Sequence, residues 1–217
     1  MKIRLLLVDD HKIVRDGLRS LLRGETDMEV AAEAENGLEA LRLAEKLNPD
    51  VIVMDVSMPD MNGIDAARAI LERSPRCRIV ALSMYSDRRF VEGMLRAGVA
   101  GYMLKDGAFE ELARAIRAVA AGQAYLSPRI AETVIKDYVH SLEGGRGGFF
   151  PELSARERQV LQLVAEGKST RNVAETLHVS VKTVETHRRQ IMEKLNVRSV
   201  AELTKCAIRE GLTSLDL

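Results

Sequence analysis

The sequence contains no tryptophan, only 4% aromatic residues and just two cysteines among its 217 residues. Cys77 and Cys206 lie far apart without C-x-x-C spacing, so they suggest neither a disulfide framework nor a zinc site, and a reducing compartment is expected. The formal net charge is zero, because 32 basic residues balance 32 acidic ones. The overall charge therefore gives no indication of a nucleic acid or a membrane as partner. Hydrophobic residues still make up 46% of the chain, which excludes a wholly disordered protein.

Long hydrophobic runs are missing as well. The chain begins MKIRLLLVDD, and Asp9 and Asp10 end its first apolar run far short of a signal-peptide core or a membrane span. We therefore expect a cytoplasmic protein with no membrane partner. At roughly 100 to 200 residues per domain, the length favours two domains, each able to bury a core.

Short apolar runs alternate with helical patterns over residues 1–122. Strands are predicted at 3–8, 28–34, 51–54, 79–82 and 101–105. Apolar residues recur with helical spacing over 12–23, 36–47, 64–73, 87–97 and 107–121. Strict alternation of this kind predicts right-handed crossovers and a doubly wound α/β domain with a five-stranded parallel sheet.

The pattern changes after residue 122. A linker is predicted over 123–150, with one amphipathic helix at 129–142 and a flexible glycine run at 144–148. Residues 151–217 read as a small all-α domain, because its short helical patterns carry clear start and stop signals. Ser154 with Glu157 and Ser199 with Glu202 form capping boxes, Ser180 is a cap, and Gly167 is a stop.

Polar groups end four of the predicted strands. Asp9 and Asp10 follow the first strand, Asp55 the third, Ser83 the fourth, and Lys105 the fifth. The second strand ends without a comparable group, which fits the strand order 2-1-3-4-5 with a reversal between strands 1 and 3, where ligands of such sheets bind. For any single residue, a helix cap or a solvated lysine is the more frequent explanation. That explanation does not suit the five residues together, because few positions of the chain lie at the ends of strands.

Three converging carboxylates call for a cation. Mg²⁺ suits a few carboxylates, several waters and a substrate phosphate, whereas Ca²⁺ needs more oxygen ligands. With the charge neutralised, Asp55 could attack phosphorus directly, while Ser83 and Lys105 hold the transferred oxygens. The chemistry predicted for this edge is therefore formation of an aspartyl phosphate.

The motifs VDDH at 8–11, DVSMPDMNG at 55–63, LSM at 82–84 and GYMLK at 101–105 together resemble the receiver domain of two-component response regulators. The resemblance covers residues 1 to about 122. It implies that Asp55 takes phosphate from a histidine kinase. It also implies a Mg²⁺ site made by Asp9, Asp10, Asp55 and the backbone carbonyl of Ser57, with phosphoryl contacts from Ser83 and Lys105 and a switch made by Ser83 and Tyr102. The position of Tyr102 alone is equally consistent with an ordinary aromatic residue of the sheet that has no switch role.

Residues 181–195 form a helical pattern with two distinct faces. Val184, Ile191 and Leu195 fall on one side, and a polar stripe falls opposite, made by Lys182, Glu185, Thr186, Arg189 and Glu193. A solvated face is the usual meaning of such a stripe. Here a short helix and the turn HVS precede a helix with a serine cap, which is typical of a helix-turn-helix whose second helix enters the major groove.

The chemistry of this helix divides its DNA-binding candidates. Arg189 could read guanine, Glu185 could accept from cytosine, and the Thr186 methyl could touch thymine. Phosphates are the expected partners of Lys182, Thr183, Arg188 and Lys194. His187 could contact a phosphate or pack at the border of the helix, and the sequence favours neither role over the other.

Residues 153–195 resemble the LuxR-type DNA-binding domain of NarL/FixJ regulators, and the likeness extends over about 151–212. It implies double-stranded promoter DNA as a partner and pairing of two DNA-binding domains through the last helix, with Val200, Leu203, Ala207 and Ile208 at the interface. Core packing within one chain would explain the same four residues. Paired half-sites one helical turn apart would raise both affinity and specificity.

The sequence thus predicts a response regulator that a histidine kinase phosphorylates on Asp55, that forms a homodimer when phosphorylated, and that regulates transcription. RNA polymerase is left open as a partner. Beyond self-catalysed uptake and hydrolysis of phosphate at Asp55, no enzyme activity is expected. One rival is an aspartate-nucleophile phosphatase, but those enzymes usually carry a second acid where this chain has Ser57. The other is a receiver module that acts only by docking to proteins.

Overall fold

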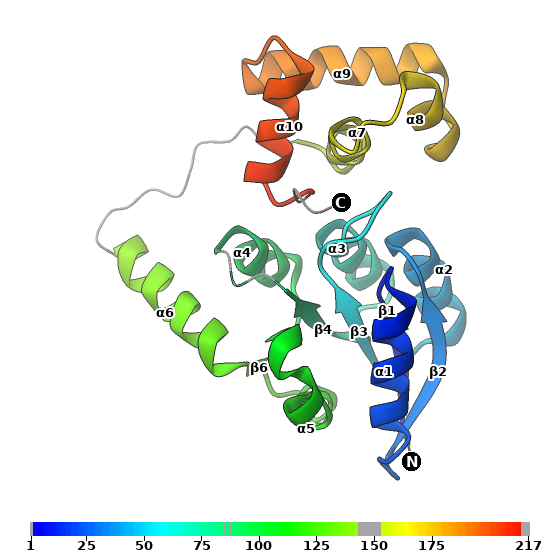
Figure 1. Ribbon diagram of the computed structural model, residues 1–217, viewed down its shortest axis with the longest axis vertical. Coiled ribbons are helices and arrows are strands. Elements are labelled where there is room, and N and C mark those ends of the chain that lie inside the picture. Colours follow the sequence, from blue (N-terminus) through cyan, green and yellow to red (C-terminus); the bar gives the residue numbers. More distant parts are fainter. Residues whose placement is uncertain (1, 85, 87, 143–152, 214–217) are drawn as a thin grey trace.

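The computed structural model describes residues 2–84, 86, 88–142 and 153–213. An α/β domain is followed along the chain by a helical domain (Figure 1). The predicted glycine run at 144–148 lies outside the described residues. Within the described ranges, none of the helices is long and apolar enough to cross a membrane.

One parallel sheet forms the centre of the first domain. Its strand order is β2-β1-β3-β4-β5-β6, so the predicted order is confirmed and one more strand is added. The strands are β1 (Ile3–Val8), β2 (Met28–Ala34), β3 (Val51–Asp55), β4 (Arg78–Ser83), β5 (Gly101–Leu104) and β6 (Tyr125–Leu126). All residues of β3 are buried, which explains why its sequence is a continuous apolar run rather than an alternating one.

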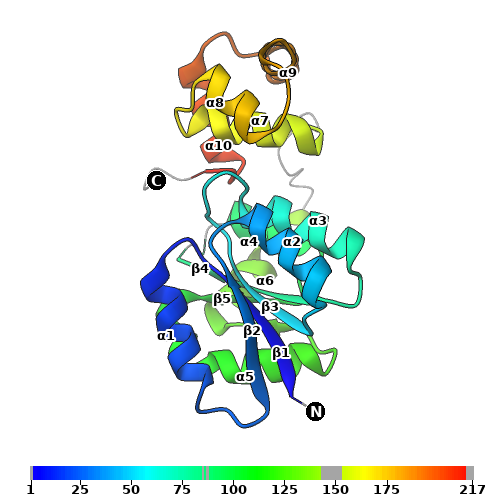
Figure 2. The same ribbon diagram turned by 90° about the vertical axis from the view of Figure 1, so that its right-hand side faces the viewer.

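Helices cover both faces of the sheet (Figure 2). One face carries α1 (Lys12–Leu22) and α5 (Ala108–Ala120), and the other carries α2 (Gly37–Leu47), α3 (Gly63–Arg73) and α4 (Arg88–Ala97). Each face has its own apolar core, because successive side chains of a strand point to opposite sides. Leu5 and Leu7 thus pack on one face, and Leu6 and Val8 on the other.

The linker prediction requires a correction, because part of the segment belongs to the first domain. Tyr125 and Leu126 pair with β5 as the sixth strand, and the backbone N–H of Ser127 donates to the carbonyl of Tyr102. The helix α6 (Pro128–Leu142) then packs through Ile130 into the core beside α4. A two-residue strand carries no periodicity, so the sequence pattern did not reveal it. Pro128 at the helix start does fit the known preference for proline there.

The second domain is the predicted small helical bundle. It contains α7 (Ala155–Ala165), α8 (Thr170–Thr176), α9 (Val181–Leu195) and α10 (Val200–Arg209). Both predicted capping boxes are present, and Ser180 caps α9 by accepting from the Thr183 N–H. The core includes Val184 and Ile191, the predicted inner face of α9. The helix boundaries thus follow from local chemistry, while the core holds the bundle together.

Gly63 begins α3 where the chain passes very close to β3. A Cβ on this residue would lie 2.1 Å from the carbonyl oxygen of Asp55 and 2.9 Å from the Cα of Val56. The Gly63 N–H also donates to the Val56 carbonyl at 2.9 Å, so the approach is part of the turn. Only glycine fits here, and it ties the start of α3 to the end of the third strand.

We therefore predict that Gly63→Ala lowers the free energy of unfolding by about 2 kcal/mol or more, because backbone atoms must move to admit the methyl group. Urea denaturation would measure the change. Gly107→Ala is the matched control, since a Cβ there meets nothing within 4 Å. Equal stability of the two variants would contradict the close approach at Gly63.

Candidate functional site

The strand registers bring the predicted polar residues to one edge of the sheet. Val8 pairs with Met54, so Asp9 and Asp55 follow on neighbouring strands. Asp55 pairs with Leu82, the residue before Ser83, and Ser83 pairs with Leu104, the residue before Lys105. Residues from four strands thus meet because parallel strands end together at the same edge.

Three carboxylates converge at this edge. One carboxylate oxygen each from Asp9, Asp10 and Asp55 and a ring nitrogen of His11 all lie within 4.8 Å of one another. Asp9 and Asp55 are buried, whereas Asp10 is partly exposed. Oxygen ligands at this spacing suit a hard divalent cation, so the residues fit the Mg²⁺ that the sequence predicts.

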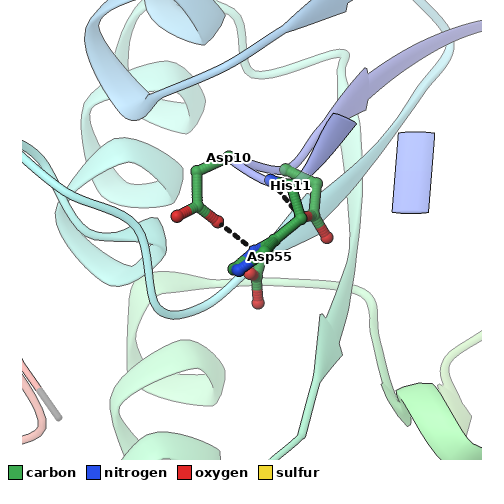
Figure 3. Close-up of side chains that lie close together, drawn as sticks. Asp10, His11 and Asp55 are labelled. Atoms are coloured by element: carbon green, nitrogen blue, oxygen red, sulfur yellow. Dashed lines mark hydrogen bonds and ion pairs between the residues drawn. The ribbon is translucent and has the colours of Figure 1, made fainter. Parts of the chain in front are cut away.

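His11 is a member of this cluster to which the sequence interpretation gave no role. Its Nδ1 lies 2.9 Å from Oδ1 of Asp10, and Figure 3 shows the two side chains together. Its backbone N–H donates to Oδ1 of Asp9 at 2.9 Å. The motif VDDH placed His11 beside the acids in sequence, but only the turn after β1 brings its ring over them.

Lys105 bridges the two buried carboxylates. Its Nζ lies 2.6 Å from Oδ2 of Asp9 and donates to Oδ2 of Asp55 at 2.9 Å. Burial raises the pKa of Asp55 to about 6, against the opposing effect of Lys105, and the charge of Asp9 adds to the increase. Burial also opposes the charged form of Lys105, but the carboxylates of Asp55 and Asp9 raise its pKa. One ammonium therefore cannot fully offset two buried carboxylates.

Ser83 and Tyr102, the residues of the predicted switch, are both completely buried. Ser83 ends β4 at the same edge of the sheet as Asp55. The resemblance implied an inward swing of the Tyr102 ring. In this structure the ring already lies within the core beneath α4, so any such movement would begin from an inward position.

The predicted DNA-reading stripe of α9 faces solvent. Lys182, Glu185, Arg189 and Glu193 are exposed and Thr186 is half-buried, while Val184 and Ile191 point into the bundle. The Thr186 hydroxyl donates to the carbonyl of Lys182 at 2.9 Å, which orders the side chain on the helix surface. The stripe is thus available for contact with a partner.

Other candidates on α9 are engaged within their own domain. Nζ of Lys194 lies 2.7 Å from Oε1 of Glu157, whose side chain is only 5% exposed. Although burial acts the other way, the hydrogen bonds of Lys194 and Ser154 lower the pKa of Glu157. Nη1 of Arg188 donates to the hydroxyl of Thr170 at 3.2 Å, and His187 is half-buried. Lys194 in particular connects α9 to α7, a role its sequence position did not suggest.

A groove along α9 adds a candidate that sequence reasoning missed. It runs from the middle of α9 to the turn before α10, and it is lined by Glu185, Arg188, Arg189, Met192, Glu193, Asn196, Val197 and Arg198. Arg198 is exposed in that turn, outside the helical pattern used for the prediction. It places a further cation beside Arg189, on the surface proposed for DNA.

Comparison with protein-family models covers both domains. Residues 5–117 match the response regulator receiver domain, and residues 151–207 match the bacterial regulatory proteins of the luxR family. The chain is a response regulator of the NarL/FixJ type. Its family comprises transcriptional regulators rather than enzymes.

Similar proteins span the whole response regulator. Transcriptional regulatory protein DegU of Brevibacillus brevis is 36% identical over 223 residues, which cover 97% of this chain and 94% of DegU. Oxygen regulatory protein NreC of Staphylococcus carnosus is 37% identical over 97% of this chain and 99% of NreC. A solved structure of RcsB from Salmonella enterica serovar Typhimurium, bound to promoter rprA in the presence of phosphomimetic BeF3-, is 26% identical with a TM-score of 0.61, covering 94% of this chain and 98% of that one.

The residues predicted to pair two DNA-binding domains divide into two groups. Leu203 and Ala207 are buried in the core of the second domain, so the alternative of packing within one chain applies to them. Val200 is 45% exposed, and Ile208 is half-buried. The reason is that α10 packs on α7, which leaves only the outer side of α10 for a second copy of the response regulator.

The raised pKa of Asp55 predicts a pH dependence of stability. Unfolded Asp55 loses its proton near pH 4 and folded Asp55 at about 6, so between these values the folded state binds the proton more firmly and stability falls as pH rises. In Asp55→Asn this loss is absent. We expect the free energy of unfolding of the variant, relative to wild type, to increase by about 1 to 3 kcal/mol from about pH 4 to about pH 7.

Urea denaturation in the presence of a chelator would measure this difference, since a bound cation would itself favour the charged carboxylate. A stability difference between Asp55→Asn and wild type that stays constant over this pH range would contradict the raised pKa of Asp55.

Proposed function

We propose that a histidine kinase phosphorylates this response regulator on Asp55 and that the modified chain binds promoter DNA through α9, as a homodimer, to regulate transcription. The observation that carries the proposal is the contact of Lys105 Nζ with Asp55 Oδ2 at 2.9 Å, beside the carboxylates of Asp9 and Asp10. A nucleophile, a cation for the transferred oxygens and a set of metal ligands thus occupy one edge of the sheet.

The proposed step is an in-line displacement. An oxygen of the Asp55 carboxylate attacks phosphorus, the new P–O bond forms as the P–N bond to the kinase histidine breaks, and the imidazole nitrogen keeps the electron pair and takes up a proton. The ammonium of Lys105 would form an ion pair with the transferred oxygens, and the Ser83 hydroxyl would donate a hydrogen bond to one of them. Water later attacks the acyl phosphate, so the protein resets itself without being an enzyme for another substrate.

The Mg²⁺ site proposed here uses carboxylate oxygens of Asp9, Asp10 and Asp55 and the backbone carbonyl of Ser57. Its chemistry is neutralisation of charge, because a phosphoryl group entering beside three carboxylates is otherwise repelled. The loop supplying Ser57 begins directly after Asp55, and the N–H of Val56 donates to Oδ1 of Asp55 at 2.7 Å. Asp55 is therefore oriented by its own loop.

Communication from Asp55 is proposed to run through Ser83 and Tyr102. Ser83 borders the site, and Tyr102 lies in the core cluster that also contains Phe90 and Met94 of α4. A hydroxyl drawn toward the phosphoryl group would shift the packing of this region, giving two arrangements that phosphate biases. The docking of partner surfaces near α4 would then depend on phosphorylation.

The proposed DNA interface is the exposed stripe of α9. Arg189, Glu185 and Thr186 are assigned to base edges, and Lys182 and Thr183 to phosphates. His187, Arg188 and Lys194 are proposed as further phosphate contacts, although Arg188 also bonds to Thr170 and Lys194 to Glu157 within their own domain. The RcsB structure bound to a promoter supports this use of the domain in a similar protein. RNA polymerase remains open as a partner, and a cytoplasmic location is proposed because promoter DNA lies there.

Phosphorylation is testable with a small phosphodonor. Wild type incubated with acetyl phosphate and Mg²⁺ is expected to gain one phosphoryl group by intact-mass spectrometry, and Asp55→Asn none. Lys105→Ala should accumulate at least about tenfold less, because the transferred oxygens lose a charged partner. The exposed-position control Lys46→Ala should match wild type. Equal modification of Asp55→Asn and wild type would reject Asp55 as the acceptor.

DNA binding is testable by separating base contacts from phosphate contacts. Arg189→Ala should lose preference for the selected operator by about 1 to 3 kcal/mol, since a bidentate base contact disappears. Lys182→Ala should weaken binding to all sequences equally and lower the salt slope by about 1. Lys46→Ala removes the same charge from the first domain and is the control for both. An unchanged sequence preference in Arg189→Ala would count against the reading role of α9.

A further inference from the structure

The second domain is seated on the loop that follows Asp55. Gln162 of α7 is completely buried. Its Nε2 donates to the carbonyl of Met58 at 3.0 Å, and its Oε1 accepts from the backbone N–H of Asn62 at 3.1 Å and from Nδ2 of Asn62 at 2.8 Å. One side chain thus pairs with backbone groups at both ends of a short loop, which is a specific contact rather than an incidental one.

Two ion pairs flank Gln162. Nε of Arg158 lies 2.7 Å from Oδ1 of Asp65 in the first turn of α3, with both side chains largely buried. Lys168, in the turn after α7, forms an ion pair with Asp60 of the loop. The cations come from the second domain and the acids from the first, so the two surfaces are complementary in charge.

A further contact joins α10 to α4. Nη1 of Arg89 donates to the carbonyl of Ile208 at 3.3 Å, close to the end of α10. The Phe90 ring lies against Gly211, and the following Leu212 and Thr213 are buried. The C-terminal end of α10 thus contacts the first domain, while Val200 at its other end is exposed.

The recognition helix lies on the opposite side. In Figures 1 and 2, α9 occupies the end of the second domain that is farthest from the sheet, with α7 and α10 between them. The side chains of Glu185, Arg189 and Arg198 are exposed in this arrangement. The docked chain therefore presents its DNA-reading stripe to solvent.

We propose that Gln162 locks the DNA-binding domain onto the Met58–Asn62 loop in an arrangement that allows contact with one DNA half-site but withholds the C-terminal end of α10 from pairing. The lock thus controls the formation of a dimer on DNA, not access to DNA. This inference rests on the proposed role of α9. It departs from a receiver that covers the recognition helix, because here the first domain contacts α7 and the end of α10.

The loop makes the lock responsive to the phosphoryl site. Met58 is one residue after Ser57, whose carbonyl is a proposed metal ligand, and three residues after Asp55. Asp60 is held at φ 65°, a left-handed conformation that persists because its surroundings fix it. A loop fixed at both ends by Gln162 transmits any displacement of Ser57 to the contact between the domains.

The decisive test fixes the lock covalently. Asp60→Cys and Lys168→Cys are combined in the full chain and joined with a short bis-maleimide, which is feasible because both positions are 30% exposed. The two native cysteines are buried, and burial raises the pKa of the Cys77 thiol to about 12, so they react slowly. The native chain treated with the same reagent is the control.

The cross-linked chain is compared with the same variant before cross-linking. On a duplex holding a single half-site, chosen by selection from random DNA, the two should bind within about threefold of each other. On a duplex with two half-sites, with acetyl phosphate and Mg²⁺ present, only the chain without the cross-link should bind cooperatively, by at least about tenfold.

Each other result overturns the inference in a distinguishable way. Loss of half-site binding only after cross-linking would mean that the docked receiver covers α9. Cooperative binding by the cross-linked chain would mean that docking leaves pairing free. If neither form binds DNA at low salt, the proposed function of α9 fails, and this inference fails with it.

A matched pair of variants tests Gln162 itself. Gln162→Ala should slow formation of the cross-link at least about fivefold, because Met58 and Asn62 lose their buried partner. Gln159→Ala lies one turn away on α7 and pairs with Arg156 of its own domain, so it should cross-link at the parent rate. Equal rates for the two variants would remove Gln162 as the lock.

Discussion

A single buried ammonium group keeps the functional edge of the sheet together. Lys105 lies between the carboxylates of Asp9 and Asp55, all three largely withdrawn from water. Isolated carboxylates buried at this spacing would repel one another and take up protons. Burial raises the pKa of Asp55 in spite of the opposing charge of Lys105, and the charge of Asp9 adds to the increase. The site is therefore electrostatically unsatisfied, which is the property that a cation and a transferred phosphoryl group can use.

The β3–α3 loop serves two sites at once. Its first residues orient Asp55, and Gly63 at its far end allows the chain to pass against the Asp55 carbonyl. Between these two parts of the loop, Met58 and Asn62 form hydrogen bonds with the side chain of Gln162 in the second domain. Coupling between two sites is reciprocal. Any effect of phosphorylation on the free energy of contact between the domains is therefore matched by an equal effect of that contact on the free energy of phosphorylation.

The second domain shows how one helix can serve structure and recognition. Val184 and Ile191 fill the core, Lys194 neutralises the buried Glu157, and Arg189 remains exposed to solvent. Similar charges on α9 thus have different tasks, set by what lies beneath them. The same holds for α10, where Leu203 and Ala207 belong to the core but Val200 does not. Exposure, not residue type, separates contact residues from packing residues.

The sequence by itself determined the order of strands, the capped helices of the second domain and the gathering of Asp9, Asp55, Ser83 and Lys105. These follow from short-range chemistry, since periodicity and caps act within a few residues and parallel strands end at a common edge. Tertiary structure alone decided the sixth strand, the pairing of Lys194 with Glu157 and the burial of Gln162 against the Asp55 loop. Those contacts join residues far apart in the chain, and no local pattern encodes a partner that only packing brings near.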